Sequence, residues 1–177
     1  VHSMDEATKG FGPEDWFWLD LSSHGMQVPD YNGDEPSKFD TAWCLADGPW
    51  VDDDVGWTVK KIVPPCLIVF ITDTCFSEGS FRKFIPFDDQ SKPVIIRMRA
   101  FDWGGSMVQM AACRESESAL GGTTGGQWHL ALAETYETSN TLREWFYAAA
   151  ELVDGQTPVL VLYGPLAEWM LDQPLRK

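Results

Sequence analysis

The chain has 177 residues, of which 44% are hydrophobic and 13% aromatic, enough to build one domain around a hydrophobic core. Its formal net charge of −14 argues against nucleic acid as a partner, because contacts with phosphates need a basic face. No apolar run approaches the ~20 residues of a membrane-spanning helix, so we expect no membrane partner.

The first third of the chain combines one strand with long polar segments. Residues 1–13 are polar and predict irregular structure, whereas the apolar residues 15–21 predict the first strand. Residues 25–56 are acidic and rich in turn-forming residues, which predicts a long loop with room for a short hairpin near residues 41–45. Residues 57–62 fit either a short helix or a strand.

The middle of the chain contains the most clearly buried strand. Residues 67–71 form an uninterrupted apolar run, which is typical of a strand covered on both faces. Residues 76–92 predict a loop directly after it, and residues 94–100 fit a strand or an extended arm. Residues 106–112 predict another strand more clearly.

The last third alternates helices with a strand. Residues 125–136 predict a helix because their apolar side chains recur at helical spacing. The capping-box pattern Thr141-Leu-Arg-Glu144 opens a second helix, and residues 158–163 predict a last buried strand. Strands that alternate with helices predict an α/β fold, here a three-layer sandwich in which helices flank a mostly parallel sheet.

Two of the predicted strands end in residues that can react together. His24 and Gly25 follow the first strand, and Cys75 follows the strand of residues 67–71. In open sheets of parallel strands, chemistry gathers outside the carboxyl ends. His24 precedes Cys75 by 51 residues, a spacing typical of caspases, whose histidine and cysteine meet in the folded protein. The pattern indicates a base and a nucleophile, although a lone cysteine is more often a small core residue.

From about residue 15 to residue 165 the chain resembles a metacaspase, a member of the caspase-like peptidase family. The resemblance rests on short blocks in the family's order: Leu21-Ser-Ser-His-Gly25, Asp30-Tyr-Asn-Gly-Asp-Glu35, Asp73-Thr-Cys-Phe-Ser-Glu-Gly-Ser80, Met110-Ala-Ala-Cys-Arg-Glu-Ser-Glu-Ser-Ala119 and Gly125-Gly-Gln-Trp128. It implies one catalytic domain over residues 1–177, with about residues 15–105 like the large subunit and about residues 106–177 like the small one. Metacaspases have two strands before the histidine strand, so we expect a missing segment upstream of Val1.

The proposed pair implies hydrolysis of an amide bond by a cysteine nucleophile. His24 would draw the thiol of Cys75 toward the thiolate, and its imidazolium would then protonate the leaving amine. We expect the oxyanion to be held by the backbone N–H groups of Gly25 and of Cys75 itself. One such donor is typically worth roughly 3–4 kcal/mol of transition-state stabilisation.

The resemblance also implies a substrate preference. Asp73 and Ser22 stand two residues before Cys75 and His24, at positions that line the pocket for the residue before the cut bond in metacaspases. An aspartate in that pocket favours Arg or Lys, so the expected partners are proteins or peptides with basic residues. Alternatively, Asp73 caps a turn or orients the loop of the nucleophile.

A calcium site is the only cofactor that the sequence suggests, and the chemistry itself requires none. The segment from Asp30 begins like an EF-hand but lacks its turn glycine and closing glutamate. Metacaspases bind calcium through scattered aspartates that resemble Asp40, Asp53 and Asp54. The family's further aspartate after the cysteine is replaced here by a basic segment, so a solvated acidic surface is an equal alternative.

Other interpretations stay open from the sequence. Phe76 and Glu78 depart from the family pattern, which leaves room for a different specificity. A catalytically inactive caspase-like interaction module is the alternative of another class, although it would have kept both His24 and Cys75. We expect Cys113 to be a structural thiol at a strand end. The four cysteines lack the spacing of a metal site or of a disulfide framework, which predicts a reducing, cytoplasmic setting.

Overall fold

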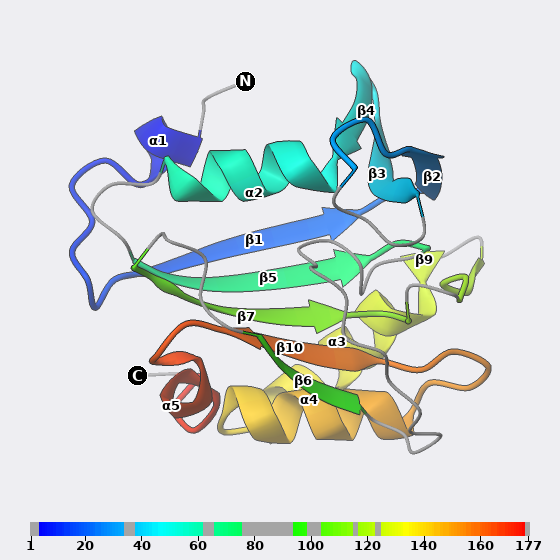
Figure 1. Cartoon of the computed structure of the whole chain (residues 1–177). Coiled ribbons are helices and arrows are strands. Elements are labelled where there is room, and N and C mark those ends of the chain that lie inside the picture. Colours follow the sequence, from blue (N-terminus) through cyan, green and yellow to red (C-terminus); the bar gives the residue numbers. More distant parts are fainter. Residues whose placement is uncertain are drawn as a thin grey trace.

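A mixed sheet of five strands runs through the centre of the computed structural model (Figure 1). The structure describes residues 4–33, 38–61, 66–75, 94–98, 104–114, 117–122 and 125–175. The strand order is β1 (Trp16–Ser22), β5 (Leu67–Asp73), β7 (Ser106–Ala111), β10 (Val159–Tyr163) and β6 (Val94–Met98). The first three strands are parallel to one another, and β10 and β6 run in the opposite direction.

The position of each strand in the sheet explains its sequence pattern. Every residue of β5, β7 and β10 is buried, because these strands lie inside the sheet and are covered on both faces. Strand β1 lies at one end of the strand order, and its outward-facing residues alternate with more covered ones. The uninterrupted apolar run of residues 67–71 therefore predicted a central strand, and this prediction is confirmed.

Helices cover both faces of the sheet, which confirms the predicted three-layer α/β sandwich. On one face, α2 (Asp52–Lys60) packs through Val55 and Val59 against Ile68 and Phe70 of the central strand. On the other face lie α3 (Gln127–Thr135), α4 (Leu142–Glu151) and α5 (Ala167–Leu171). Because side chains alternate along a strand, neighbouring residues of β5 enter opposite cores.

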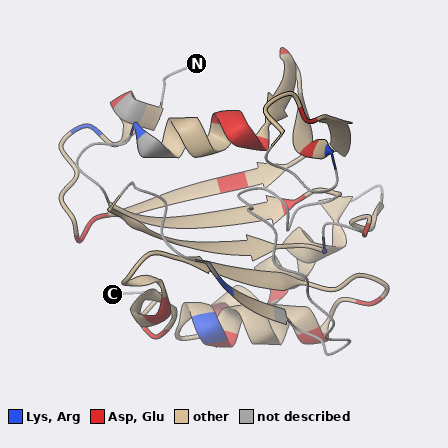
Figure 2. Cartoon of the chain, in the orientation of Figure 1, with Lys and Arg blue, Asp and Glu red and all other residues tan. Residues whose placement is uncertain are grey.

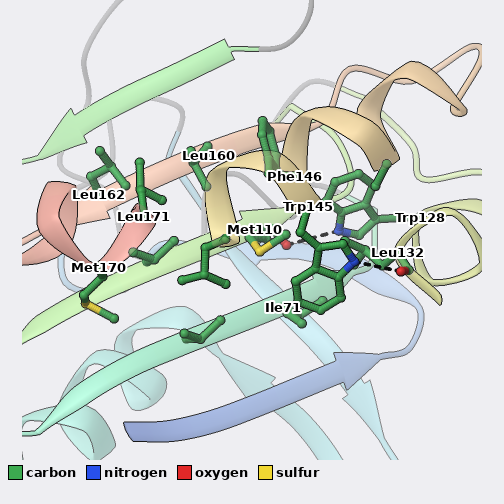
Figure 3. Packing of buried hydrophobic residues seen from close by; sticks show 14 of the residues in the cluster. Ile71, Met110, Trp128, Leu132, Trp145, Phe146, Leu160, Leu162, Met170 and Leu171 are labelled. Atoms are coloured by element: carbon green, nitrogen blue, oxygen red, sulfur yellow. Dashed lines mark hydrogen bonds between the residues drawn. The ribbon is translucent and has the colours of Figure 1, made fainter. Parts of the chain in front are cut away.

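Aromatic side chains fill the core under α3 and α4 (Figure 3). The rings of Trp128 and Phe146 meet edge to face, with 5.6 Å between their centroids. Both buried indoles are satisfied, since Trp128 Nε1 donates to the carbonyl of Met110 at 3.2 Å and Trp145 Nε1 donates to that of Leu132 at 2.7 Å. A buried indole N–H without a partner would carry a desolvation cost, and these two bonds avoid it.

The predicted helix after Thr141 is confirmed together with its cap. The Thr141 hydroxyl accepts the backbone N–H of Glu144 at 3.2 Å at the start of α4. The Glu144 carboxylate reaches back to the backbone N–H of Asn140 at 2.8 Å, one residue before the cap. Two backbone donors near the helix N-terminus are thereby satisfied.

The prediction of a long loop over residues 25–56 is wrong, although the short hairpin expected near residues 41–45 is present. This segment contains β2 (Gly25–Pro29), β3 (Phe39–Leu45) and β4 (Gly48–Val51), which form an antiparallel sheet of their own, and α2 begins at Asp52. Trp43 of β3 explains the difference, because its buried ring contacts Trp50 and Phe70. The Trp43 indole N–H also donates to the Thr74 hydroxyl at 3.0 Å. Acidic and turn-forming residues concealed a strand that is held by these distant contacts.

Smaller elements were also missed. The amino-terminal segment predicted as irregular contains the short helix α1 (Met4–Ala7), and the segment after β10 contains α5. The ambiguous residues 57–62 belong to a helix as far as Lys60, and residues 94–98 form the strand β6. The predicted loop over residues 76–92 lies outside the described residues. In the part of the chain that is described, no helix is long and apolar enough to cross a membrane.

Candidate functional site

The ends of β1 and β5 bring His24 and Gly25 against Cys75. The two strands are parallel, and Ser22 lies opposite Asp73 in their register, so both chains leave the sheet at the same edge. A Cβ atom placed on Gly25 would collide with the carbonyl group of Cys75, which shows how closely the two backbones approach. Only glycine allows this approach. The structure thus brings together the two candidate catalytic residues and both predicted oxyanion donors.

The backbone at His24 is held from the other side by β3. The carbonyl of His24 accepts the backbone N–H of Cys44 at 2.8 Å, and the imidazole is exposed. Within the described residues, no hydrogen bond joins the imidazole to the thiol of Cys75. Catalytic hydrogen bonds are often long in a protein without substrate and shorten in the complex. The arrangement therefore brings the backbone of the His24-Gly25 segment close to that of Cys75.

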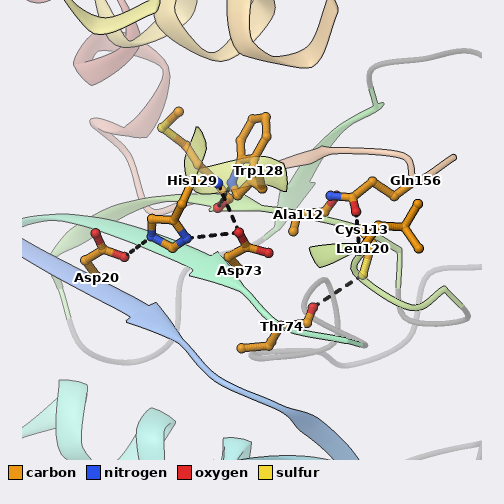
Figure 4. A network of polar contacts seen from close by, with 10 residues as sticks. Asp20, Asp73, Thr74, Ala112, Cys113, Leu120, Trp128, His129 and Gln156 are labelled. Atoms are coloured by element: carbon orange, nitrogen blue, oxygen red, sulfur yellow. Dashed lines mark hydrogen bonds and ion pairs between the residues drawn. The ribbon is translucent and has the colours of Figure 1, made fainter. Parts of the chain in front are cut away.

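The thiol of Cys75 is partly exposed and faces the segment of residues 117–120. Its sulfur lies 4.0 Å from the carbonyl oxygen of Ala119. Gln156 holds this segment, because its side-chain amide accepts the N–H of Leu120 at 2.5 Å and donates to the carbonyl of Ala112 at 3.0 Å (Figure 4). The segment beside the thiol is thereby linked by hydrogen bonds to Gln156, in the loop before β10.

Cys113 is a buried thiol at the end of β7, as the sequence predicted. Its sulfur lies 3.4 Å from the carbonyl oxygen of Thr74 and 3.3 Å from that of Glu117. It thus links the segment of the nucleophile to residues 117–120. All four cysteines are free. A structural role, without access to a substrate, is what these contacts support for Cys113.

Asp73 extends from the end of β5 to the start of α3. Its side chain is 1% exposed, and its Oδ2 accepts the backbone N–H of His129 at 3.0 Å. The residue before the helix, Gly126, has no side chain that could cap it, and a Cβ there would collide with the Asp73 carboxylate. Asp73 therefore caps α3 from a neighbouring strand and places a negative charge where the helix dipole favours one.

His129 lies between two carboxylates. Its Nδ1 is 3.0 Å from Oδ2 of Asp73, and its Nε2 contacts Oδ1 of Asp20, which lies on β1 (Figure 4). Partial burial lowers the pKa of His129, but the hydrogen bonds and charges of Asp20 and Asp73 outweigh it and raise that pKa to about 9. The imidazole is thus a cation near neutral pH and joins β1, β5 and α3.

The contacts of His129 bear on the predicted substrate-binding residues, Ser22 and Asp73. Ser22 is exposed and shares a sheet face with Asp20 and Asp73, as the register and alternation of the strands require. The buried Asp73 carboxylate is already engaged by His129, which matches the alternative that it orients local structure. Its role in binding a substrate stays a prediction. Sequence reasoning gave His129 no role, because nothing local connects a helical histidine to acids 56 and 109 residues away.

The predicted calcium residues do not gather into a site. Asp40 is buried, whereas Asp53 and Asp54 are exposed at the start of α2. The described part of the chain contains no group of three His, Cys, Asp or Glu side chains arranged to hold a metal. Asp53 instead accepts the side-chain N–H of Asn32 at 2.5 Å, and Asp30 accepts the backbone N–H of Asn32 at 3.0 Å. The calcium site that the resemblance implies stays a prediction.

Several acidic residues lie near the candidate site. Figure 2 shows acidic residues on β1, at the end of β5 and at the start of α2. The arginines Arg97 and Arg143 lie elsewhere, where they pair with Glu168 at 3.1 Å each, and Arg143 also pairs with Asp172 at 2.7 Å. This edge also carries a basic residue, because Arg114 follows the end of β7, which is parallel to β5.

Comparisons with known proteins support the fold. No family model and no curated protein matches the chain. Among solved structures, the chain is similar to protein GSU0716 from Geobacter sulfurreducens, with a TM-score of 0.73 and 22% identical residues. The match covers 97% of this chain and 74% of that one. At this identity the likeness shows a shared α/β fold and nothing about activity.

Proposed function

We propose that the protein is a cysteine endopeptidase of metacaspase type, with Cys75 as nucleophile and His24 as general base. The observation that carries the proposal is the contact of Gly25 with the backbone of Cys75, where two parallel strands end side by side. The exposed imidazole and the partly exposed thiol are both accessible to a substrate. The resemblance in the sequence supports the same pair.

The reaction would run in two stages. His24 takes the proton of the Cys75 thiol, the thiolate attacks the peptide carbonyl carbon, and the imidazolium of His24 protonates the amine as the C–N bond breaks. Backbone N–H groups of Gly25 and Cys75 would stabilise the oxyanion. Water, deprotonated by His24, then attacks the thioester, and the proton returns to the sulfur as the acid product leaves. The proton count balances, and no cofactor is needed.

The proposed substrates are proteins or peptides with Arg or Lys before the cut bond. Asp20 and Asp73 place two carboxylates on the sheet face beside the nucleophile, and the net charge of −14 favours the approach of basic peptides. An aspartate before the cut bond would meet like charges, which cost several kcal/mol at short range in typical interfaces.

Selective alkylation tests the dyad before any substrate is known. Iodoacetamide should modify Cys75 at least tenfold faster than Cys44, an exposed thiol whose backbone N–H is bonded to the carbonyl of His24 but whose sulfur lies 3.6 Å from the sulfur of Met26. His24→Ala should remove this advantage and leave the rate at Cys44 unchanged. Mass spectrometry of the digested protein gives both rates.

Peptide cleavage then tests the activity itself. A panel of fluorogenic peptides with Arg, Lys, Asp or Leu before the scissile bond should be cleaved by the wild type, fastest after Arg or Lys, and not by Cys75→Ala. Equal alkylation of Cys75 and Cys44, together with no cleavage, would refute the proposal and favour the inactive interaction module. Such an outcome would agree with a thiol that faces a carbonyl instead of an imidazole.

A further inference from the structure

The carboxylate best placed to recognise a basic substrate is already occupied by a cation of the protein itself. Asp73 lies two residues before Cys75, and its carboxylate accepts hydrogen bonds from both the backbone N–H and the ring Nδ1–H of His129. Asp20 holds the other ring nitrogen. A guanidinium or an ammonium group that approached Asp73 would have to compete with this ring.

We infer that His129 is a specificity-determining residue of the proposed peptidase, because its ring takes the place between Asp20 and Asp73 that a substrate's Arg or Lys would occupy. The inference rests on the proposed function. In the wild type, the ring of His129 therefore weakens the preference for Arg or Lys before the cut bond. This preference becomes stronger when His129 is replaced or loses its charge.

The arrangement of the contacts supports competition instead of a purely structural pair. Both hydrogen bonds to Asp73 use Oδ2, so Oδ1 takes part in neither. The backbone N–H of His129 would keep its bond to Oδ2 if the ring rotated away, and α3 would keep its cap. The His129 side chain is 26% exposed and that of Asp20 is 60% exposed, so the ring is partly exposed and covers the Asp73 carboxylate, which is 1% exposed.

Removal of the ring should leave two carboxylates without their cation. Two carboxylates close together raise the affinity of the space between Asp20 and Asp73 for any cation that fits there. A guanidinium matches this place well, because its several N–H donors can reach both carboxylates at once. A neutral side chain of similar size gains nothing from the change, which provides the control.

The kinetic test compares matched peptides with Arg or Leu before the scissile bond. His129→Gln should raise the ratio of kcat/KM for Arg over Leu at least tenfold, and the double variant His129→Gln with Asp73→Asn should bring the ratio back to the wild-type value. Leu130→Ala, at an exposed position of the same helix, controls for general disturbance of α3 and should leave the ratio unchanged. An unchanged ratio in folded His129→Gln would overturn the inference.

A binding test decides the question even if no peptide is cleaved, in which case the proposed function fails by itself. Benzamidine, measured by calorimetry at pH 7, should bind His129→Gln at least tenfold more tightly than the wild type, whereas neutral benzamide should bind both proteins equally. If the variant does not fold, the wild type serves: its affinity for benzamidine should rise as the pH passes about 9, where His129 between Asp20 and Asp73 loses its proton. An affinity for benzamidine that is the same in wild type and His129→Gln, and that does not rise above about pH 9, would overturn the inference.

Discussion

Gly25→Ala is the most direct probe of the site, because this glycine is where the backbones of the two candidate catalytic segments meet. A methyl group at this position would collide with the carbonyl oxygen and carbon of Cys75. Both partners are backbone atoms, so no side-chain rotation can relieve the clash. The end of β1 must move away from the end of β5, and His24 moves with it.

The size of the effect follows from the cost of overpacking. An extra methyl group in a tightly packed place typically destabilises a protein by about 1–3 kcal/mol. Gly56→Ala is the matched control, since Gly56 lies inside α2 and a Cβ there meets nothing within 4 Å. Replacing a helical glycine by alanine should stabilise the protein by about 0.5–1 kcal/mol. The two substitutions therefore have opposite expected signs.

Urea unfolding of the three proteins gives the free energies, and iodoacetamide labelling reports on the site. Gly25→Ala should lower the free energy of unfolding and remove the excess reactivity of Cys75 over Cys44, whereas Gly56→Ala should keep that excess. A Gly25→Ala protein with wild-type stability and wild-type labelling of Cys75 would refute the close approach of the two strand ends.

Two further predictions concern charge. The pKa of His129 is raised from 6.5 to about 9 on folding, so its ion pairs stabilise the protein fully below about pH 6.5, and this contribution is lost as the pH rises through about 9. The difference in unfolding free energy between wild type and His129→Gln should therefore shrink between pH 6 and pH 10 by on the order of 3 kcal/mol, and a constant difference would contradict the pairing. Millimolar calcium should leave the melting temperature unchanged, because Asp40, Asp53 and Asp54 do not gather; a rise that Asp53→Asn abolishes would restore the calcium site.

The sequence predicted those parts of the fold whose signals are local. The apolar run of β5 and the cap at Thr141 each fix an element within a few residues, and both are confirmed. The full length of β3 could not be predicted, beyond a short hairpin near residues 41–45, because the strand is stabilised by Trp43, whose partners Phe70 and Thr74 lie far along the chain. The acidic and turn-forming residues of the segment 25–56 predicted a loop instead.

In the candidate site, too, features with local sequence signals could be predicted and features that depend on distant contacts could not. The nearness of the His24-Gly25 segment to Cys75 could be predicted because two short motifs at strand ends must meet if the strands are neighbours and parallel. The ion pair of Asp73 with His129 could not, because it depends on how α3 is placed against the sheet. The sequence indicates a role for Asp73 and predicts a substrate as its partner, whereas its partner in the structure is His129.

The contacts around Cys75 favour a placement that is set before any substrate binds. The two residues before it are held from opposite layers of the sandwich: Asp73 by α3, through the backbone and ring of His129, and Thr74 by β3, through the indole of Trp43. Cys75 itself lies against Gly25. A nucleophile fixed in this way needs little reorganisation to attack, which is the condition for efficient covalent catalysis. The exposed imidazole of His24 takes part in none of these contacts, so its substitution should affect the reactivity of the thiol without displacing the sulfur.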